Sequence, residues 1–229
     1  MEFQGINKLS LLDYPGKVAA ILYVNKCNFH CDYCHNWNTL IAADDNEDLL
    51  FNDILSFLKK RIGVLDGVVI SGGEPTLIPD LEDKIRRIKE LGYLIKLDTN
   101  GSHPEVVESL ISKGIIDYIA VDVKSSLDEY HRFTNNEALI PNVKKTIELL
   151  KQNKVDYEFR MTLMQEYHNE NIIRKVGELI KGSKRIYLQQ FKDSDGVVNK
   201  NLHPVDEGLA NHYVEILSQY VDEVSLRGY

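Results

Sequence analysis

Short apolar runs alternate with amphipathic stretches along nearly the whole chain of 229 residues. The apolar runs are typical of buried strands, and the intervening stretches carry apolar residues at helical spacing. We expect strands over residues 18–24, 67–70, 93–97, 118–123, 157–163, 185–189 and 223–226. We expect helices over residues 47–61, 81–91, 104–112, 142–152, 170–180 and 206–220. Such alternation favours parallel β–α–β units and therefore an α/β fold.

Six such units, with no Pro-, Gly- or Ser-rich linker between them, predict a single domain over residues 1–229. A full eight-unit barrel typically needs about 250 residues, so six units favour an open, partial (β/α)6 TIM-like barrel. A doubly wound sheet is the alternative, which the hydrophobic pattern does not separate from the barrel. In both topologies the active-site side chains follow the carboxyl ends of the strands.

Charge and cysteine content exclude several classes of protein. The chain has 27 Lys and Arg against 35 Asp and Glu, a net charge of −8, which disfavours nonspecific binding to nucleic acid or anionic membranes. No apolar stretch reaches the roughly 18 residues of a membrane span, and the first residues do not follow a signal-peptide pattern. Three clustered cysteines are a poor disulfide framework. We therefore expect a cytoplasmic protein with neither nucleic acid nor membrane as a partner.

All three cysteines follow the first apolar run with the spacing C-x3-C-x2-C, at Cys27, Cys31 and Cys34. Three thiolates can hold three corners of a cubic iron–sulfur cluster and leave the fourth iron open to a substrate. Zinc is the alternative, because it usually takes four ligands and His30 or His35 could complete the set. Zinc sites more often show paired C-x-x-C knuckles, and only one is present here, so the spacing favours the cluster.

Polar side chains follow the other predicted strands. In chain order these are Ser71-Gly72-Gly73-Glu74-Pro75, Asp98-Thr99-Asn100-Gly101, Asp122-Val123-Lys124, Arg160 and Gln189-Gln190-Phe191. Carboxylates at two strand ends, Asp98 and Asp122, would suit a hard cation. Lys124 and Arg160 could bind a carboxylate of a ligand. An internal salt-bridge network among these four residues is the alternative.

The cysteine motif, with the aromatic Tyr33 just before its last cysteine, resembles the signature of the radical S-adenosylmethionine (SAM) enzymes. The segment Gly72-Gly73-Glu74 is similar to the glycine-rich stretch with which these enzymes bind the methionine part of SAM. Glycines would let the backbone approach the ligand, although glycine pairs also form ordinary strand-to-helix turns. Glu74 could orient the SAM amino group or cap the helix that follows.

Two further segments narrow the resemblance. Residues 10–17, which contain the type II turn sequence Tyr14-Pro15-Gly16, and the segment Cys34-His35-Asn36 are similar to those of the glycyl radical enzyme activases. Within this group the chain most resembles the anaerobic ribonucleoside-triphosphate reductase activating proteins, with the pyruvate formate-lyase activases close by. The resemblance covers nearly the whole chain.

The resemblance implies cofactors and partners. It implies a [4Fe–4S] cluster on the three cysteines, SAM on its open iron, and a glycyl radical formed on a partner, above all an anaerobic ribonucleotide reductase. It also implies a flavodoxin- or ferredoxin-type electron donor. The residues that would contact SAM are Tyr33, Gly72, Gly73, Glu74, Asp98, Asn100, Lys124, Arg160 and Gln189. A monovalent cation would lie on Asp98, Thr99 and Asp122.

One position departs from the pattern. Pyruvate formate-lyase activases carry a histidine near the SAM ribose where this chain has Phe191, and Gln189 or Gln190 could supply the ribose hydrogen bonds instead. Two other functions stay open: a radical SAM enzyme acting on a small molecule, similar to 7-carboxy-7-deazaguanine synthase, and a zinc-stabilised binding module. The scattered histidines are expected at the surface or at helix caps; they are His103, His131, His168, His203 and His212.

Overall fold

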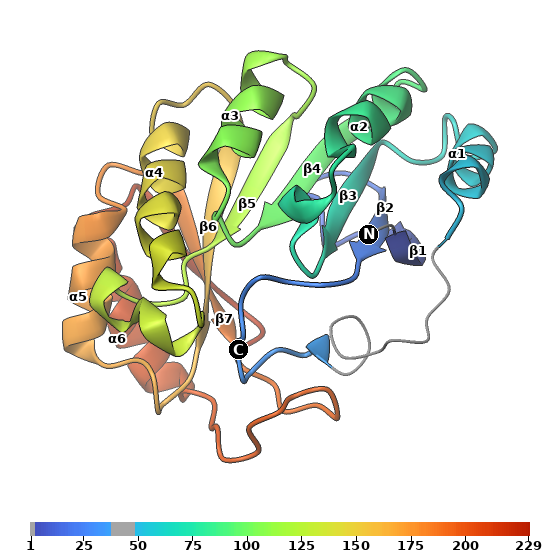
Figure 1. Cartoon of the computed structure of the whole chain (residues 1–229). Helices are drawn as coiled ribbons and strands as arrows, with labels where there is room; N and C mark the ends of the chain where they lie inside the picture. The colour runs from blue at the N-terminus through green and yellow to red at the C-terminus, as the bar shows by residue number, and fades with distance from the viewer. Residues whose placement is uncertain (1–2, 38–48) are drawn as a thin grey trace. The chain divides into compact units, whose positions relative to one another are not determined.

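The computed structural model describes residues 3–37 and 49–229, and its elements follow the predicted alternation closely (Figure 1). The strands are β1 (Phe3–Ser10), β2 (Ala19–Val24), β3 (Gly67–Gly72), β4 (Leu94–Thr99), β5 (Tyr118–Asp122), β6 (Asp156–Leu163), β7 (Arg185–Gln190) and β8 (Glu223–Arg227). The α-helices are α1 (Phe51–Lys59), α2 (Leu81–Lys89), α3 (Pro104–Ser112), α4 (Ile140–Leu150), α5 (Glu170–Leu179) and α6 (Glu207–Leu217). Short 3-10 helices are η2 (Pro75–Leu77), η3 (Leu127–Arg132) and η4 (Glu137–Leu139). Residues 47 and 48 of the first predicted helix lie outside the described residues.

The strand order decides between the two predicted topologies. In the described chain the strands hydrogen-bond in sequence order, from β1 to β8. The pairs β2–β3, β3–β4, β6–β7 and β7–β8 are parallel. A doubly wound sheet reverses its strand order at a switch point, whereas a barrel adds each strand beside the preceding one. The predicted α/β class with a parallel-strand sheet is therefore confirmed, and the order is compatible with a partial barrel.

The sequence pattern missed the strand β1, which pairs antiparallel with β2. Its sequence is largely polar and its middle residues are half-buried or exposed, so no apolar run marks it. The connection to β2 contains the predicted type II turn: Lys17 N–H donates to the Tyr14 carbonyl at 3.1 Å, and Gly16 has a φ of +67°.

By their contacts, the residues divide into two compact units. The first unit comprises Met1–Asn28, Asn36–Thr99 and Glu105–Ile119, and the second comprises Phe29–His35, Asn100–Pro104 and Ala120–Tyr229. The boundary runs through the cysteine motif, so Cys27 belongs to the first unit while Cys31 and Cys34 belong to the second. The extent of a single domain over residues 1–229 stays a prediction.

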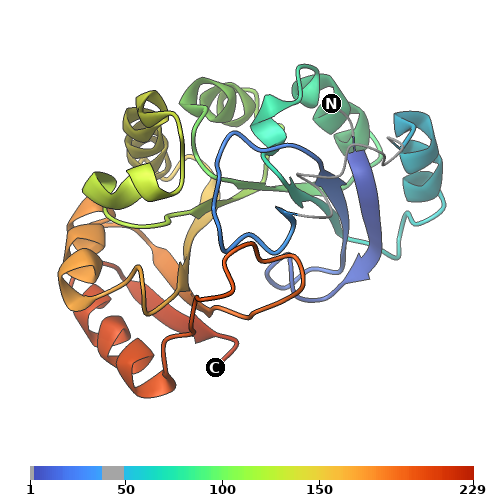
Figure 2. The same cartoon turned by 60° about the horizontal axis from the view of Figure 1, so that its bottom comes forward.

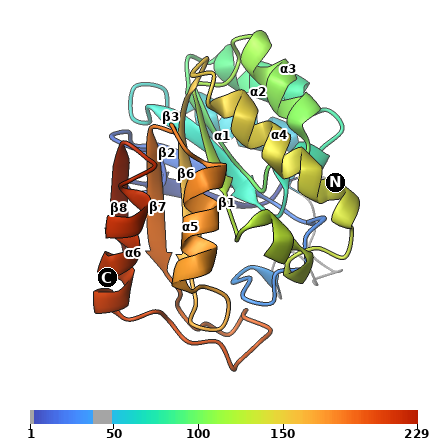
Figure 3. The ribbon, with the colours of Figure 1, turned by 90° about the vertical axis from the view of Figure 1, so that its left-hand side faces the viewer.

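Each unit has its own apolar core. In the first, α2 contacts β4; Ile85 and Ile88 of α2 are fully buried, as are Ile95 and Leu97 of β4. In the second, α5 and α6 lie side by side, and α6 packs against β8 (Figure 3). Among the described residues, no helix has the length and apolar character needed to cross a membrane.

One histidine contradicts the expectation of surface or capping positions. His168, which follows β6, is only 3% exposed. Its Nδ1 accepts from the Met164 N–H at 3.1 Å, and its Nε2 lies 3.0 Å from the Lys124 carbonyl oxygen, to which it can donate. Both ring nitrogens are therefore used within the second unit, in an arrangement that the neutral ring satisfies.

Replacing His168 with glutamine should reduce the decrease in the free energy of unfolding that the protein undergoes in mild acid. Burial lowers the pKa of His168 below its ordinary value of 6.5, so below about pH 6.5 the unfolded chain binds a proton that the folded chain does not. As the pH is lowered through this range, the free energy of unfolding should decrease by up to about 1.4 kcal/mol per pH unit. Urea unfolding between pH 7.5 and 5 would measure the difference, and His131→Gln, at an exposed position, is the matched control. Equal pH dependence in wild type and His168→Gln would contradict this prediction.

Candidate functional site

The glycine segment after β3 lies directly against the backbone that leads into the cysteine motif. Because Val24 pairs with Gly72, the ends of β2 and β3 are in register. Gly72 has a φ of +110°, and a Cβ there would lie 2.5 Å from the Val24 carbonyl oxygen. A Cβ on Gly73 would lie 1.9 Å from the carbonyl oxygen of Lys26, the residue before Cys27. The absence of a side chain at these glycines therefore lets the two backbones pack closely at the start of the cysteine motif. Sequence reasoning missed this packing role. The predicted contact of these glycines with SAM stays a prediction.

Backbone hydrogen bonds complete this contact within the first unit. The Gly73 N–H donates to the Val24 carbonyl at 2.8 Å, and the Glu74 N–H donates to the Lys26 carbonyl at 2.9 Å. Lys26 itself has a φ of +62°, which is uncommon for a residue other than glycine. The entry into the cysteine motif is thus set by main-chain contacts, which few side-chain changes could move.

Glu74 is fully buried and joins the ends of β3 and β4. Its Oε1 accepts from the Thr76 N–H at 3.1 Å, from Thr76 Oγ1 at 2.5 Å and from Thr99 Oγ1 at 2.7 Å. The side chain caps the 3-10 helix η2, so the predicted cap is present on a nearer and shorter helix than expected. The other predicted role, orienting the SAM amino group, is not tested by these contacts.

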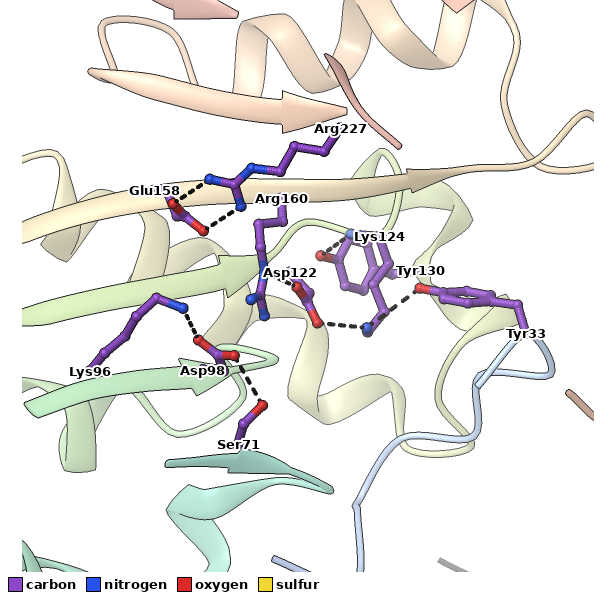
Figure 4. Close-up of polar contacts among 10 residues, drawn as sticks. All are labelled: Tyr33, Ser71, Lys96, Asp98, Asp122, Lys124, Tyr130, Glu158, Arg160 and Arg227. Atoms are coloured by element: carbon purple, nitrogen blue, oxygen red, sulfur yellow. Dashed lines mark hydrogen bonds and ion pairs between the residues drawn. The ribbon is translucent and has the colours of Figure 1, made fainter. Parts of the chain in front are cut away.

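Asp98, at the end of β4, has partners on both carboxylate oxygens (Figure 4). Ser71 Oγ donates to Oδ2 at 2.9 Å, and Lys96 Nζ donates to Oδ1 at 2.5 Å. Lys96 is 1% exposed, and its Nζ lies 5.9 Å from the centroid of the Tyr118 ring. Sequence reasoning did not name Lys96, although a lysine two residues before an aspartate in a strand projects to the same face.

A second polar cluster lies in the second unit, around Asp122 at the end of β5 (Figure 4). Arg160 Nε donates to Asp122 Oδ1 at 2.9 Å, and Lys124 Nζ lies 3.7 Å from Oδ2. Lys124 Nζ also donates to the Tyr33 hydroxyl at 3.4 Å. This hydrogen bond links the polar cluster around Asp122 to the cysteine motif. Ion pairs of the predicted internal salt-bridge network are therefore present among Asp122, Lys124 and Arg160.

Electrostatics hold Lys124 in its charged form. Burial alone would lower the pKa of Lys124, but charge interactions with Cys31, Tyr33 and Asp122, in that order of size, outweigh burial and raise the pKa. Burial raises the pKa of Tyr33 above its ordinary value, so the hydroxyl stays neutral and can accept from Lys124. A fixed positive charge therefore lies beside the residue between Cys31 and Cys34, and this charge could attract an anionic group of a ligand.

The remaining predicted SAM contacts have defined surroundings. Asn100 is 5% exposed, and its Oδ1 accepts from the Ser102 N–H at 2.9 Å. Gln189 and Gln190 end β7 in half-buried positions. Phe191 is 2% exposed and stacks on the His35 ring, with the ring centroids 6.0 Å apart and the planes at 28°. At the position compared with a ribose-contacting histidine, Phe191 therefore packs against the cysteine segment.

The segment around the last two cysteines is held by parts of the chain that sequence reasoning did not connect with it. The Asp32 carbonyl accepts from the N–H groups of Val198 and Asn199 at 3.1 and 3.0 Å. The Asp32 carboxylate accepts from Asn199 Nδ2 at 2.8 Å and from the Tyr167 hydroxyl. Figure 2 shows the loop after β7 beside this segment. No local sequence signal marks such contacts, because the partners are more than 130 residues apart in the chain.

The three thiols fit an iron–sulfur cluster by their chemistry. None of the three cysteines forms a disulfide, and they share one loop outside helices and strands. Burial raises the pKa of the Cys31 thiol to about 11, so a ligated thiolate there would need the positive charge of a metal. Among residues 3–37 and 49–229, no three His, Cys, Asp or Glu side chains are gathered as a single metal ion would require. Cysteine thiolates are the ligands that iron–sulfur clusters take, so the donor set of three thiols on one loop fits such a group.

The comparisons with known proteins agree with this donor set. Residues 21–179 match the family model described as Radical SAM superfamily. A protein of Methanocaldococcus jannaschii named "Putative glycyl-radical enzyme activating enzyme" is 37% identical over 97% of this chain and 94% of its own length. A pyruvate formate-lyase-activating enzyme of Clostridium pasteurianum is 28% identical over 56% of this chain and 54% of its own.

A structural comparison gives the same fold. SuiB of Streptococcus suis, solved with S-adenosylmethionine bound, superposes with a TM-score of 0.69 over 91% of this chain and 52% of its own, at 15% identity. The family match spans more than half of the chain and includes the cysteine motif, the glycine segment, Asp98, Asp122, Lys124 and Arg160. Membership of this family implies a [4Fe–4S] cluster and SAM as cofactors. The chain belongs to the radical SAM superfamily.

Proposed function

We propose that this chain is a glycyl radical enzyme activase, which cleaves SAM reductively and generates a glycyl radical on a partner enzyme. The observation that carries the proposal is the 37% identity to a relative named as such an activase over 97% of this chain, because the match leaves little of either protein outside it. Within the group, an anaerobic ribonucleotide reductase is the proposed partner. The buried Phe191, where pyruvate formate-lyase activases carry a histidine, argues against a pyruvate formate-lyase partner.

Different residues of the chain would bind the iron–sulfur cluster and the two charged groups of the SAM methionine part. Cys27, Cys31 and Cys34 would hold the cluster, which supplies the electron that cleaves SAM. Lys124 and Arg160 carry the positive charges that would bind the SAM carboxylate, while the buried Glu74 carboxylate would receive the amino group. Electrons would come from a flavodoxin- or ferredoxin-type donor.

Further predicted contacts complete the SAM site. The glycine segment and Asn100 would line the ligand through backbone and amide groups, Gln189 would reach the ribose, and Tyr33 would stay in place beside Lys124. The surrounding apolar residues would exclude water from a reactive species. A loop of the partner would then have to close the site, since glycine offers no side chain that obstructs entry.

The proposed function is tested with the reconstituted protein, a chemical reductant and purified anaerobic ribonucleotide reductase. We expect slow, uncoupled SAM cleavage by the chain alone and a stable protein-based radical signal in electron paramagnetic resonance when the partner is added. Glycine labelled with ¹³C at Cα in the partner should broaden that signal. Efficient SAM turnover on a purine metabolite, with no radical on any partner, would instead support the function similar to 7-carboxy-7-deazaguanine synthase.

Replacing Arg160 with glutamine should weaken SAM binding by about 1.5–3 kcal/mol, the usual contribution of a charge-assisted hydrogen bond. Arg185→Gln is the matched control, since Arg185 is half-buried in the same unit and pairs with Asp156 and Glu223 at the start of its strand. Equilibrium binding of SAM and thermal unfolding would be measured on both variants. Unchanged SAM affinity in Arg160→Gln, together with earlier melting, would show that Arg160 contributes to stability and not to SAM binding.

A further inference from the structure

Asp98 and Asp122, the two carboxylates expected to bind a monovalent cation, each form an ion pair with a cationic side chain of the protein. In the first unit, Lys96 Nζ lies 2.5 Å from Asp98 Oδ1, and the other oxygen accepts from Ser71. The two partners are almost fully buried, with side chains 2% and 10% exposed. A metal ion at Asp98 would therefore have to displace the ammonium or bind beside its positive charge.

The other predicted cation ligands are similarly engaged. In the second unit, Asp122 pairs with Arg160 at 2.9 Å and with Lys124 at 3.7 Å. The Thr99 hydroxyl donates to Glu74. Each aspartate thus has cationic partners within its own unit, Lys96 for Asp98 and both Arg160 and Lys124 for Asp122, so neither carboxylate has surplus negative charge for a monovalent metal ion. The residues present do not fit the cation that the resemblance implied.

The position of Lys96 suits a permanent counter-charge. Lys96 and Asp98 are two residues apart on β4, so their side chains leave the same face of the strand. The ammonium also lies 5.9 Å from the centroid of the Tyr118 ring, whose face attracts cations. A tethered ammonium in this position is present at any salt concentration, whereas a free ion would have to bind from solution.

We propose that the Lys96 ammonium takes the place of a monovalent metal ion at Asp98, so that SAM binding by this chain needs no such ion. Lys96 would act as a positioning residue, because it keeps the Asp98 carboxylate neutralised and in place beside Ser71. The proposal rests on the SAM site proposed above, but its test does not involve a partner enzyme.

The first measurement uses the wild-type, cluster-loaded protein. SAM affinity and thermal unfolding are compared in potassium, sodium and N-methylglucamine chloride at equal ionic strength. We expect the dissociation constant to change by less than about twofold among the three salts at equal ionic strength, because the Lys96 ammonium accompanies Asp98 in all of them. N-methylglucamine is the control, since this large organic cation cannot enter a metal site. A several-fold gain in affinity in potassium or sodium alone would overturn the proposal.

The second measurement replaces Lys96 with methionine, which is similar in length but uncharged. The buried Asp98 would lose its counter-charge, so we expect melting about 5–10 °C earlier and SAM binding at least about tenfold weaker. Potassium, sodium or methylammonium should restore much of both losses, whereas N-methylglucamine should not. Lys96→Arg should retain the wild-type indifference to salt.

A matched control separates this role from general loss of a buried lysine. Lys84 is 3% exposed, pairs with Asp80, and lies 5.5 Å from the centroid of the Phe51 ring. Lys84→Met should lower stability without any rescue specific to small cations, since the Asp80 side chain is 55% exposed to water. Equal rescue of both variants, or normal SAM binding by Lys96→Met in N-methylglucamine, would contradict the proposal. Absence of a radical on a partner would bear on the proposed function alone.

Discussion

Replacing Cys27, Cys31 or Cys34 with alanine, one at a time, should abolish SAM cleavage and remove most of the bound iron. These are the chain's only cysteines, and none of them forms a disulfide. After anaerobic reconstitution the wild type should bind about four irons, the content of one cubic cluster. Each variant would lose a ligand that no other thiol of the chain can replace. Iron analysis, the visible absorption of the cluster and the release of 5′-deoxyadenosine would measure the effect.

Two histidines of the same segment provide the controls. His30→Ala and His35→Ala should retain the iron and its absorption, because the cluster interpretation uses cysteine ligands alone. The zinc interpretation makes the opposite prediction, since it needs one of these histidines as the fourth ligand. Tightly bound zinc in freshly purified protein, no uptake of iron, and loss of the metal in one histidine variant would contradict the cluster.

Replacing Gly73 with alanine should have the second large effect, on both stability and cluster loading. The new Cβ would overlap the Lys26 carbonyl oxygen at 1.9 Å, and neither backbone can move without displacing the start of the cysteine motif. We expect a loss of more than about 3 kcal/mol in the free energy of unfolding, or an insoluble product. Urea unfolding and iron content after reconstitution would measure the two effects.

Two other glycines separate steric overlap from backbone strain. Gly92 has a φ of +93° with nothing within 4 Å of a Cβ, so Gly92→Ala should cost only the strain, about 1–2 kcal/mol. Gly72→Ala combines a φ of +110° with a contact at 2.5 Å and should cost more than Gly92→Ala. Iron binding should survive in Gly92→Ala alone. A Gly73→Ala protein as stable and as iron-rich as Gly92→Ala would show that the cysteine motif tolerates displacement.

The sequence by itself determined the α/β class, most of the strands and helices, and the main chemical candidate. Apolar runs and helical spacing are local patterns, so the strands and helices could be placed to within a few residues, as at α3 (Pro104–Ser112). The cysteine spacing is also local, and it indicated the cluster before any contact was known. The polar strand ends followed from the rule that a parallel sheet places its functional residues there.

Only the tertiary structure decided what each of these side chains contacts. The strand β1 depends on pairing with β2, and its own polar sequence gives no signal. Burial of His168 depends on the chain that packs around it, which periodicity does not reveal. The order of strands in the sheet, which excludes the doubly wound alternative, likewise arises from long-range hydrogen bonds.

In the candidate site, too, the sequence identified the charged residues but only the tertiary structure decided their partners. The sequence named Asp98, Asp122, Lys124 and Arg160 as either a ligand site or a salt-bridge network, because charge alone does not specify partners. The structure pairs Asp98 with Lys96 and pairs Asp122 with Arg160 and Lys124. Sequence patterns report which residues lie on the same face of an element, whereas the pairing of buried charges depends on distances that only the packed chain sets.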